Sequence, residues 1–167
     1  MRYALIKTLL AVTTIAFGFG LAACEKSMDK TPAQAEANLK AGQEFLAKTA
    51  KEPGIVKMPS GILYKVVSSP TPAAAKPSIK DTVKVHYEGK LVDGTVFDSS
   101  YERGVPAAFP LEGLVKAWQI AIPEMHKGDT WILYVPPELG YGAEAAGEIP
   151  PNSVLVFKIQ LIDIEGR

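Results

Sequence analysis

VHYEGKLVDGTVFDSS, residues 85–100, is the stretch that decides the fold. Apolar and polar side chains alternate along its first half, which is the period of a strand with one face in a core and the other in water. Asp93 and Gly94 are predicted to supply the positive φ angles of a tight hairpin turn. A returning strand at 96–98 then presents Phe97 and Asp98 together. The acid is a candidate for proton transfer, for metal binding, or for a role that needs no proton.

The same patterns predict further strands and one short helix outside the hairpin. Strands are predicted at 62–67, 81–91, 96–98, 130–135 and 154–164. Apolar residues spaced as on a helix occupy 114–122, around Trp118, and Pro123 ends that segment. Because strands and helices do not alternate regularly, we expect an α+β fold in which an antiparallel curved β-sheet wraps around one short helix. The segment 68–78, SSPTPAAAKPS, is predicted to be a surface loop between paired strands.

Residues 24–58 are predicted to form an N-terminal helical tether. Their composition is rich in Ala, Lys, Glu and Gln, and a helix is expected at 33–51, with Pro32 at its start and Pro53 just beyond it. The apolar stripe of this helix is thin. We therefore expect a spacer docked loosely on its own domain, and an interaction helix is the alternative.

The first residues are typical of an export signal. Arg2 and Lys7 precede the mostly apolar stretch 8–23, which is shorter than the ~20 residues that a membrane-spanning helix needs. The stretch ends in Leu-Ala-Ala-Cys, which resembles the lipobox of bacterial lipoproteins. The resemblance implies that residues 1–23 are a cleaved lipoprotein signal peptide and that Cys24 is lipidated. An ordinary signal peptide with an incidental cysteine is the alternative.

Several classes of function find no support in the residues. Lys+Arg and Asp+Glu both number 18, so no basic surplus points to nucleic acid. The two histidines, His86 and His126, have no metal-ligand spacing around them, and both are expected to be surface residues. No GxSxG motif indicates a serine hydrolase, and Ser99 and Ser100 are expected to form a turn in which their hydroxyls satisfy nearby backbone groups. Gly140-Tyr141-Gly142 lacks the lysine of a phosphate-binding loop.

An unusual set of aromatic residues lies near the predicted loops. These are Tyr87, Phe97, Phe109, Trp118, Tyr141 and Phe157. The motifs VHYEG (85–89), DGTVFDSS (93–100), Trp118, GYG (140–142), IPPNS (149–153) and LVF (155–157) resemble, in order and spacing over 61–165, the FK506-binding (FKBP) peptidyl-prolyl isomerases. PSGILYKV (59–66) and AGQEFL (41–46) resemble the bacterial macrophage-infectivity-potentiator (Mip) and FkpA-like branch.

The resemblance implies that residues 59–167 form an FKBP-type isomerase domain. Such a domain accelerates X-Pro isomerisation during the folding of exported proteins, by desolvation and hydrogen-bond stabilisation of a twisted amide. The implied catalytic residues are Tyr87, Phe97, Asp98, Tyr141 and Phe157, and the implied substrate-binding residues are Phe109, Leu114, Val115, Trp118 and Ile149. Trp118 forms the pocket floor, Tyr141 donates to a substrate carbonyl, and Asp98 is expected to accept a hydrogen bond from Tyr141. Asp98 as a turn-capping acid is the alternative.

The resemblance also implies partners and a location. The partners are proline-containing polypeptides, FK506- or rapamycin-like macrolides, and a membrane through Cys24, without nucleic acid, metal or cofactor. Glu25 is not the Asp that commonly retains lipoproteins on the inner membrane, which favours an outer-membrane anchor on the periplasmic face. Few residues separate Cys24 from the first matching strand, so a monomer is expected rather than a dimer. Ala107 replaces a common aromatic and the loop 143–148 is acidic, which motivates the alternative of a lipoprotein acting mainly as a chaperone or peptide-binding module.

Overall fold

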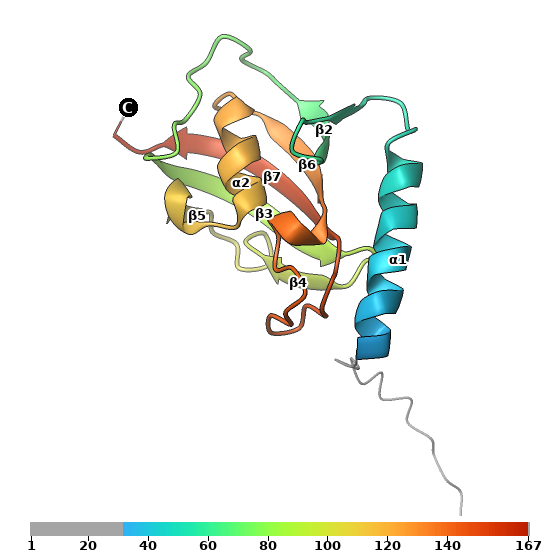
Figure 1. The fold of residues 1–167 in the computed structure, drawn as a ribbon. Helices are drawn as coiled ribbons and strands as arrows, with labels where there is room; N and C mark the ends of the chain where they lie inside the picture. Colours follow the sequence, from blue (N-terminus) through green and yellow to red (C-terminus); the bar gives the residue numbers. More distant parts are fainter. Residues whose placement is uncertain (1–31, 167) are drawn as a thin grey trace, which may run out of the picture.

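A helix lies beside a domain in which a curved sheet wraps around a second, shorter helix (Figure 1). The computed structural model describes residues 32–166, so the predicted signal peptide and Cys24 lie outside the described residues. The two helices are α1 (Pro32–Thr49) and α2 (Lys116–Ala121). This arrangement confirms the predicted α+β class, with an antiparallel sheet around one short helix and a helix before it.

Within residues 32–166 all strands belong to one antiparallel sheet. The strands are β1 (Ile55–Lys57), β2 (Leu63–Ser68), β3 (Thr82–Leu91), β4 (Val96–Ser99), β5 (Ala107–Pro110), β6 (Thr130–Val135) and β7 (Leu155–Ile164). Their order is β1-β2-β6-β7-β3-β4, and β5 also pairs with β3. Short 3-10 turns, η1 (Leu111–Gly113), η2 (Ile122–Glu124) and η3 (Pro137–Leu139), complete the domain. Within residues 32–166, neither helix combines the length and the hydrophobicity that a membrane-spanning segment requires.

The predicted strands are confirmed as β2, β3, β4, β6 and β7, with each end shifted by at most one residue. Two strands were missed. β1 has three residues and β5 has four, which is too short for an alternating pattern to show. The interpretation of 68–78 as a loop between paired strands was wrong. β2 pairs with β1 and β6, whereas β3 pairs with β7, β4 and β5, so this segment crosses between separate parts of the sheet (Figure 1).

α2 is shorter than the predicted helix at 114–122, for a local reason at each end. Val115 has an extended backbone, with φ −58° and ψ 148°, so it precedes the helix as its N-cap. Pro123 has no N–H to donate, and the chain leaves the α-helical pattern for the 3-10 turn Ile122–Glu124. A helix of six residues is unstable alone in water. Its packing against the sheet therefore maintains it.

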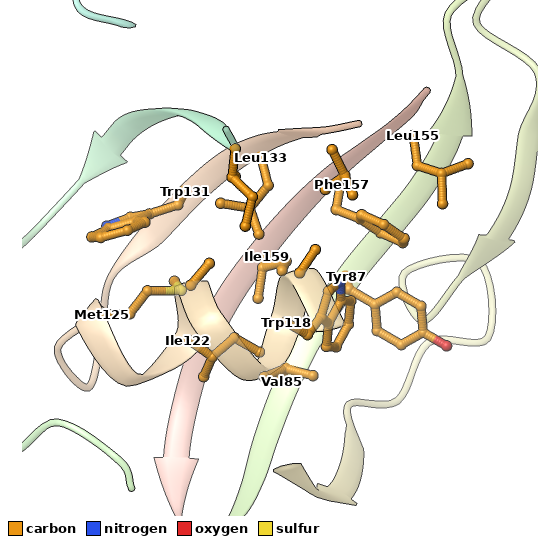
Figure 2. Close-up of a cluster of buried hydrophobic side chains, with 14 of the residues drawn as sticks. Val85, Tyr87, Trp118, Ile122, Met125, Trp131, Leu133, Leu155, Phe157 and Ile159 are labelled. Carbon is orange, nitrogen blue, oxygen red and sulfur yellow. The ribbon is translucent and has the colours of Figure 1, made fainter. Parts of the chain in front are cut away.

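The core lies between α2 and the concave face of the sheet (Figure 2). Fully buried side chains fill this space: Ile122 and Met125 after α2, and Val85, Leu133 and Ile159 from the sheet. Each such side chain stabilises the fold by roughly 1.5–3 kcal/mol when it leaves water. The core therefore holds the start of α2, and with it Trp118, at a set position over the sheet.

Residues 92–95 join β3 to β4, and backbone hydrogen bonding between Leu91 and Thr95 closes a turn of three residues, 92–94. The Gly94 N–H donates to the Leu91 oxygen at 3.0 Å, and the Leu91 N–H donates to Thr95 at 2.9 Å. Gly94 has φ +90°, but Asp93 is not among the described residues with positive φ. The expectation of positive φ angles at both positions was therefore wrong. A three-residue loop needs the left-handed conformation only at its last residue.

A β-bulge brings Phe97 and Asp98 to the same side of the hairpin. Gly89 pairs with Asp98, but Lys90 pairs with Val96, so Phe97 is an extra residue in β4. In a regular strand, two successive side chains would point to opposite faces. The bulge removes that alternation, as bulges near functional sites commonly do.

Gly89 is the place where the chain can accommodate the ring of Phe97. A Cβ at this position would lie 2.6 Å from Phe97 Cε2 and Cζ and 2.9 Å from Phe157 Cε1. Real Cβ atoms do not approach other heavy atoms so closely. The two rings therefore lie directly over bare backbone near the C-terminal end of β3.

We predict that Gly89→Ala lowers the free energy of unfolding by about 1–3 kcal/mol, because the added methyl group overpacks the site. Urea unfolding followed by circular dichroism measures the change. Gly113→Ala is the matched control, because a Cβ there meets nothing within 4 Å and no positive φ is needed. The control should stay within about 0.5 kcal/mol of the original protein. Equal stability of the two variants would contradict this account of Gly89.

Candidate active site

Aromatic side chains from five elements converge at one end of α2. They are Tyr87 from β3, Phe97 from β4, Phe109 from β5, Trp118 from α2 and Phe157 from β7. The Trp118 ring centroid lies 5.3 Å from that of Tyr87, 5.4 Å from Phe157 and 6.4 Å from Phe109. These rings meet edge to face, at interplanar angles between 74° and 84°. Such contacts are favourable beyond the burial of area. We call these five residues the aromatic cluster.

Trp118 forms the base of the aromatic cluster. Its side chain is buried, and its Nε1–H has no hydrogen-bond partner among the described residues. Ring packing, and no polar contact, therefore holds the indole in place. Phe97 and Phe109 are only partly buried, so the cluster is accessible to solvent on their side. The result is an apolar site whose base is rigid.

Two loops carry the other site residues that the sequence predicts. Leu114 and Val115 precede α2, are partly buried and pack against the core, and the Val115 N–H makes no hydrogen bond within residues 32–166. Ile149 is buried and packs in the same core. Tyr141 is 42 % exposed, and its hydroxyl has no hydrogen-bond partner among the described residues. Leu114, Val115 and Ile149 thus pack with the core that holds the aromatic cluster, whereas Tyr141 is exposed on its loop, and the Val115 N–H and the Tyr141 hydroxyl are two donors without a partner among the described residues.

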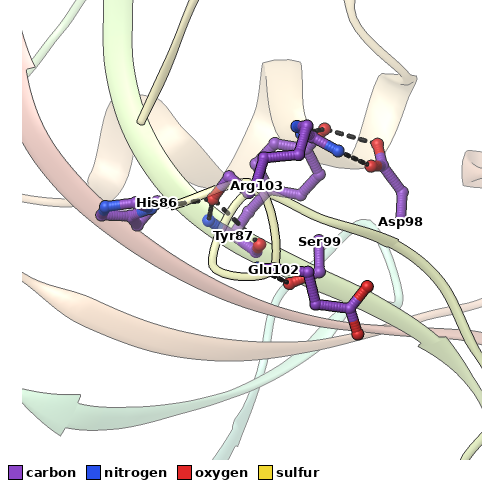
Figure 3. Close-up of polar contacts among 7 residues, drawn as sticks. His86, Tyr87, Asp98, Ser99, Glu102 and Arg103 are labelled. Atoms are coloured by element: carbon purple, nitrogen blue, oxygen red, sulfur yellow. Dashed lines mark hydrogen bonds and ion pairs between the residues drawn. The ribbon is translucent and has the colours of Figure 1, made fainter. Parts of the chain in front are cut away.

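Asp98 bonds to Tyr87, and the expectation that it accepts from Tyr141 was wrong. The Tyr87 hydroxyl donates to Asp98 Oδ2 (Figure 3). The reason is the register of the hairpin: Asp98 pairs with Gly89, two residues from Tyr87 on the same face of β3. Tyr141 lies on a separate loop, beyond η3. Asp98 therefore orients Tyr87, a residue of the aromatic cluster, and not the hydroxyl of Tyr141.

Arg103 is the site residue that the sequence analysis missed. Its Nη1 donates to Asp98 Oδ1, and its Nη2 donates to the Tyr87 hydroxyl at 2.8 Å (Figure 3). The guanidinium carbon also lies 5.5 Å from the centroid of the Tyr87 ring. The sequence signal for this contact was a basic residue five positions after Asp98, in the loop that follows the hairpin.

The surroundings of Asp98 and Tyr87 keep each of these two groups in a single protonation state at neutral pH. Burial alone would raise the pKa of Asp98, but the hydrogen bonds from Tyr87 and Arg103 and the charge of Arg103 together lower this pKa below its ordinary value. Burial and the hydrogen bond to Asp98 raise the pKa of the Tyr87 hydroxyl. Asp98 is therefore ionised and Tyr87 protonated across the neutral range. Neither group is suited to exchange a proton there.

The predicted turn serines are confirmed. The Ser100 hydroxyl accepts a hydrogen bond from the Tyr87 N–H at 2.7 Å and donates one to the backbone carbonyl oxygen of Tyr87 at 3.1 Å. Ser99 Oγ accepts a hydrogen bond from the Glu102 N–H at 3.3 Å. Both serines are buried. His86 Nδ1 lies 2.9 Å from Ser100 Oγ, so this histidine supports the same loop (Figure 3). The contacts fix the backbone of β3 at Tyr87 against the loop.

An open cavity of about 390 Å³ lies next to the contact between Asp98 and Arg103. Phe97, Asp98, Arg103 and the acids Glu102 and Glu148 line it. In the part of the chain from 32 to 166, no group of three or more His, Cys, Asp or Glu side chains could hold a metal ion. The site as described offers apolar rings, free hydrogen-bond donors and an ion pair at its edge.

Comparisons with known proteins match both parts of the chain. The family model described as FKBP-type peptidyl-prolyl cis-trans isomerase matches residues 73–162, and the model described as the domain amino terminal to it matches residues 11–66. The chain is 43 % identical over 131 residues to the peptidyl-prolyl cis-trans isomerase Mip of Coxiella burnetii, covering 78 % of this chain and 56 % of the relative.

Two further similarities agree with these matches. The outer membrane protein MIP of Legionella longbeachae is 44 % identical over 133 residues, which cover 79 % of this chain and 56 % of the relative. The crystal structure of FkpA from Escherichia coli superposes with a TM-score of 0.75 at 40 % identity, covering 79 % of this chain and 61 % of that one. The chain thus spans little more than half the length of the curated relatives that it matches.

We predict that Arg103→Gln raises the pKa of Asp98 toward the ordinary value of about 3.9, because a cation and its hydrogen bond are lost. Tyr87→Phe should act in the same direction. A carboxyl NMR titration measures both. Lys127→Gln is the matched control: Lys127 Nζ lies 2.5 Å from Asp163 Oδ1 and lowers the pKa of that carboxyl. It should raise the pKa of Asp163 and leave Asp98 unchanged.

The same pKa shift fixes the sign of a stability change. The pKa of Asp98 is lower in the folded state, so its contribution to stability is present above the unfolded pKa and is lost as pH falls through the folded pKa. Arg103→Gln should therefore lose less stability on acidification than the original protein. An unchanged pKa of Asp98 in both site variants would contradict the described network.

Proposed function

This chain belongs to the family of FKBP-type peptidyl-prolyl cis-trans isomerases, and we propose that it accelerates the cis-trans isomerisation of X-Pro bonds in exported polypeptides as they fold. The aromatic cluster around Trp118 carries the proposal. It offers a proline ring a rigid apolar base and partly exposed walls from Phe97 and Phe109. No nucleophile or metal is needed for such a reaction, because no bond is broken.

The energy required is small compared with what such a site can supply. Rotation about an X-Pro bond must overcome a barrier of about 18–20 kcal/mol, because the twisted amide loses its resonance. A thousandfold acceleration requires about 4 kcal/mol of differential stabilisation. A dry pocket with a few hydrogen bonds realised in the twisted state is sufficient.

Desolvation is the first contribution that we assign to the site. A planar amide has more charge separation than a twisted one, so transfer from water to an apolar surface raises the ground state more than the transition state. Trp118 contacts the proline ring in this proposal, and Leu114 and Val115 enclose it from the loop before α2. The edges of Tyr87, Phe97 and Phe157 surround the carbonyl oxygen that rotates.

Hydrogen bonding to the substrate is the second contribution. The exposed Tyr141 hydroxyl donates to a substrate carbonyl, and the unpaired Val115 N–H donates to another, in agreement with their lack of partners within the described residues. Ile149 closes the site from the loop after Tyr141. These donors hold the chain on either side of the proline while the bond between them turns.

Asp98 and Arg103 act on Tyr87 in this mechanism and not on a proton of the substrate. Their three-way contact fixes the Tyr87 ring against Trp118, and the lowered pKa of Asp98 together with the raised pKa of Tyr87 leaves neither group titrating near neutrality. The reaction should show no dependence on pH from these groups between about pH 6 and pH 8.

The remaining sequence-based expectations are also proposals. We assign residues 59–167 to the isomerase domain and residues 24–58 to the tether. The tether range includes β1, which adds a strand to the edge of the sheet. A monomer is supported by α1, whose only strongly exposed large apolar side chain is Leu39, at 39 %. FK506- or rapamycin-like macrolides would occupy the aromatic cluster, with a thinner wall at Ala107 than the family commonly has.

We place the protein on the periplasmic face of the cell envelope, tied through lipidated Cys24 to the outer membrane. The Leu-Ala-Ala-Cys motif after an apolar segment supports the anchor, and Glu25 supports the outer membrane. The relative from Legionella longbeachae bears the name outer membrane protein, which agrees with this placement. Acyl chains stabilise anchoring by about 0.8 kcal/mol for each buried CH₂ group.

We predict that the protein isomerises an X-Pro peptide and that two variants are impaired. Trp118→Ala removes the base of the cluster and should abolish most of the acceleration. Tyr141→Phe removes a single donor and should lower kcat/KM about fivefold. Tyr101→Phe is the matched control, because Tyr101 is 38 % exposed but stacks on His86, at 4.7 Å between centroids, away from the cluster. An NMR line-shape or fluorescent-peptide assay measures the rates.

The original protein at the uncatalysed rate would refute the proposed reaction. Circular dichroism of each variant shows whether a loss reflects unfolding. Suppression of the aggregation of an unfolded chain, measured on the same variants, tests the alternative of a holding chaperone. That alternative gains support if Trp118→Ala isomerises nothing but still suppresses aggregation as strongly as the original.

We predict that Cys24→Ser releases the exported protein from the membrane fraction without changing its rate of isomerisation, because only the thiol can carry the lipid. Cell fractionation followed by the peptide assay measures both properties. Unchanged membrane association of the variant would contradict the proposed anchor.

A further inference from the structure

α1 packs closely on Val154, in the segment between β7 and the loop that carries Tyr141 and Ile149. A Cβ on Gly42, in the middle of α1, would lie 2.6 Å from Val154 Cγ2. Gly42 and Thr49 are buried, and the Phe45 ring lies 6.0 Å from that of Tyr134. The helix therefore lies against its own domain along much of its length (Figure 1). This is more specific than the loosely docked spacer expected from the sequence.

Two asparagines bridge α1 and this loop in opposite directions. Asn38 Nδ2 on α1 donates to the Pro151 oxygen at 2.9 Å, and Asn152 Nδ2 on the loop donates to the Ala35 oxygen at 3.1 Å. Gln34 Nε2 donates to Asn38 Oδ1 at 2.8 Å, which turns the Asn38 amide so that its NH₂ group faces Pro151. The bridge is thus reciprocal and oriented.

The bridged loop also carries two of the site residues, Tyr141 and Ile149. The Asn152 N–H donates to the Gly142 oxygen at 2.8 Å, beside Tyr141. Ile149 pairs with Ala146 through two backbone hydrogen bonds, of 2.9 and 3.0 Å, three residues before Asn152. Asn152 has φ +55° and is the only described non-glycine residue with a positive φ. One residue in an uncommon conformation thus contacts α1 and the Tyr141 turn.

The composition of α1 supports a role for this face beyond tethering. Asn and Gly are both poor helix formers in a helix interior. Asn38 and Gly42 nevertheless occupy the middle of α1, one turn apart, and both contact the loop at 151–154. A helix that served only as a spacer would gain nothing from either residue.

We propose that α1 is part of the active-site scaffold, and that Asn38 and Asn152 are positioning residues that hold Ile149 and Tyr141 in the substrate-binding arrangement. The inference rests on the proposed isomerase function. If the loop is in the competent arrangement for only part of the time, the apparent affinity for substrate falls by that fraction. Contacts of α1 keep the fraction near one. Chemistry at the bound amide depends on the aromatic cluster, which α1 does not touch through these residues.

The test uses the full chain with two variants on the docked face of α1 and two controls on its exposed face. Asn38→Ala removes the bridge, and because Ala is the better helix former the helix itself is retained. Gly42→Leu forces α1 away from Val154. Gln43→Ala and Ala41→Leu make comparable changes at neighbouring exposed positions. Asn152→Gly removes the other amide but permits the positive φ.

For Asn38→Ala, Gly42→Leu and Asn152→Gly we expect KM for an X-Pro peptide to rise about fivefold while kcat changes less than about twofold. The controls should match the original protein. Hydrogen exchange provides a readout without substrate. The Ile149 and Asn152 amides should exchange about fivefold faster in the docked-face variants, and the Trp118 amide, bonded to Val115 at 2.9 Å, should not change.

Normal KM and normal loop exchange in Asn38→Ala and Gly42→Leu would overturn the inference. Faster exchange of the loop with unchanged KM would also overturn it, because the loop would then be ordered by α1 without affecting binding. An original protein with no isomerase activity would refute the proposed function itself and with it the positioning role. Equal losses at Trp118 and at the loop amides would indicate general destabilisation and would count against the inference.

Discussion

The missing side chain at Gly89 is the constraint on which the site depends. Phe97 and Phe157 lie over this bare backbone, at distances that no Cβ would permit. Phe157 then meets Trp118 edge to face, and Trp118 meets Tyr87 and Phe109 in the same way. The bulge at Phe97 is equally necessary, because it turns both Phe97 and Asp98 toward the side of Gly89. A strand without the glycine would not leave room for the two rings, and a strand without the bulge would point Phe97 and Asp98 to opposite faces.

The polar residues beside the rings have a structural task. An acid near a pocket suggests proton transfer, but the contacts with Tyr87 and Arg103 lower the pKa of Asp98, and burial together with the hydrogen bond to Asp98 raises the pKa of Tyr87. Their bonds fix the ring of Tyr87, and the buried Ser100 fixes its backbone. The proposed reaction turns a bond without breaking it and needs surfaces that stay in place, and these contacts provide one.

The sequence predicts local features well and relations between distant segments poorly. Alternation with a period of two located β3, β6 and β7 because each has a buried and a wetter side over several residues. The same signal cannot show β1 and β5, which are too short, nor the order of strands, which depends on packing across the sheet. The family resemblance predicted which residues form the site. It did not predict the bulge, the Tyr87–Asp98 hydrogen bond or the contact of Arg103, because these depend on the register between β3 and β4. The close packing of α1 on the domain could not be predicted, because Asn38 and Gly42 look like ordinary polar and small residues of an exposed helix.

The most direct test of the central claim is to observe a bound proline on Trp118 while the peptide isomerises. Two-dimensional exchange NMR on an X-Pro peptide with a small fraction of the protein gives the rate, and intermolecular NOEs give the position of the ring. The account predicts cis-trans exchange peaks that appear only with the protein, together with NOEs from the proline ring to the Trp118 indole. Exchange peaks accompanied by NOEs to another surface, or bound peptide without accelerated exchange, would contradict it.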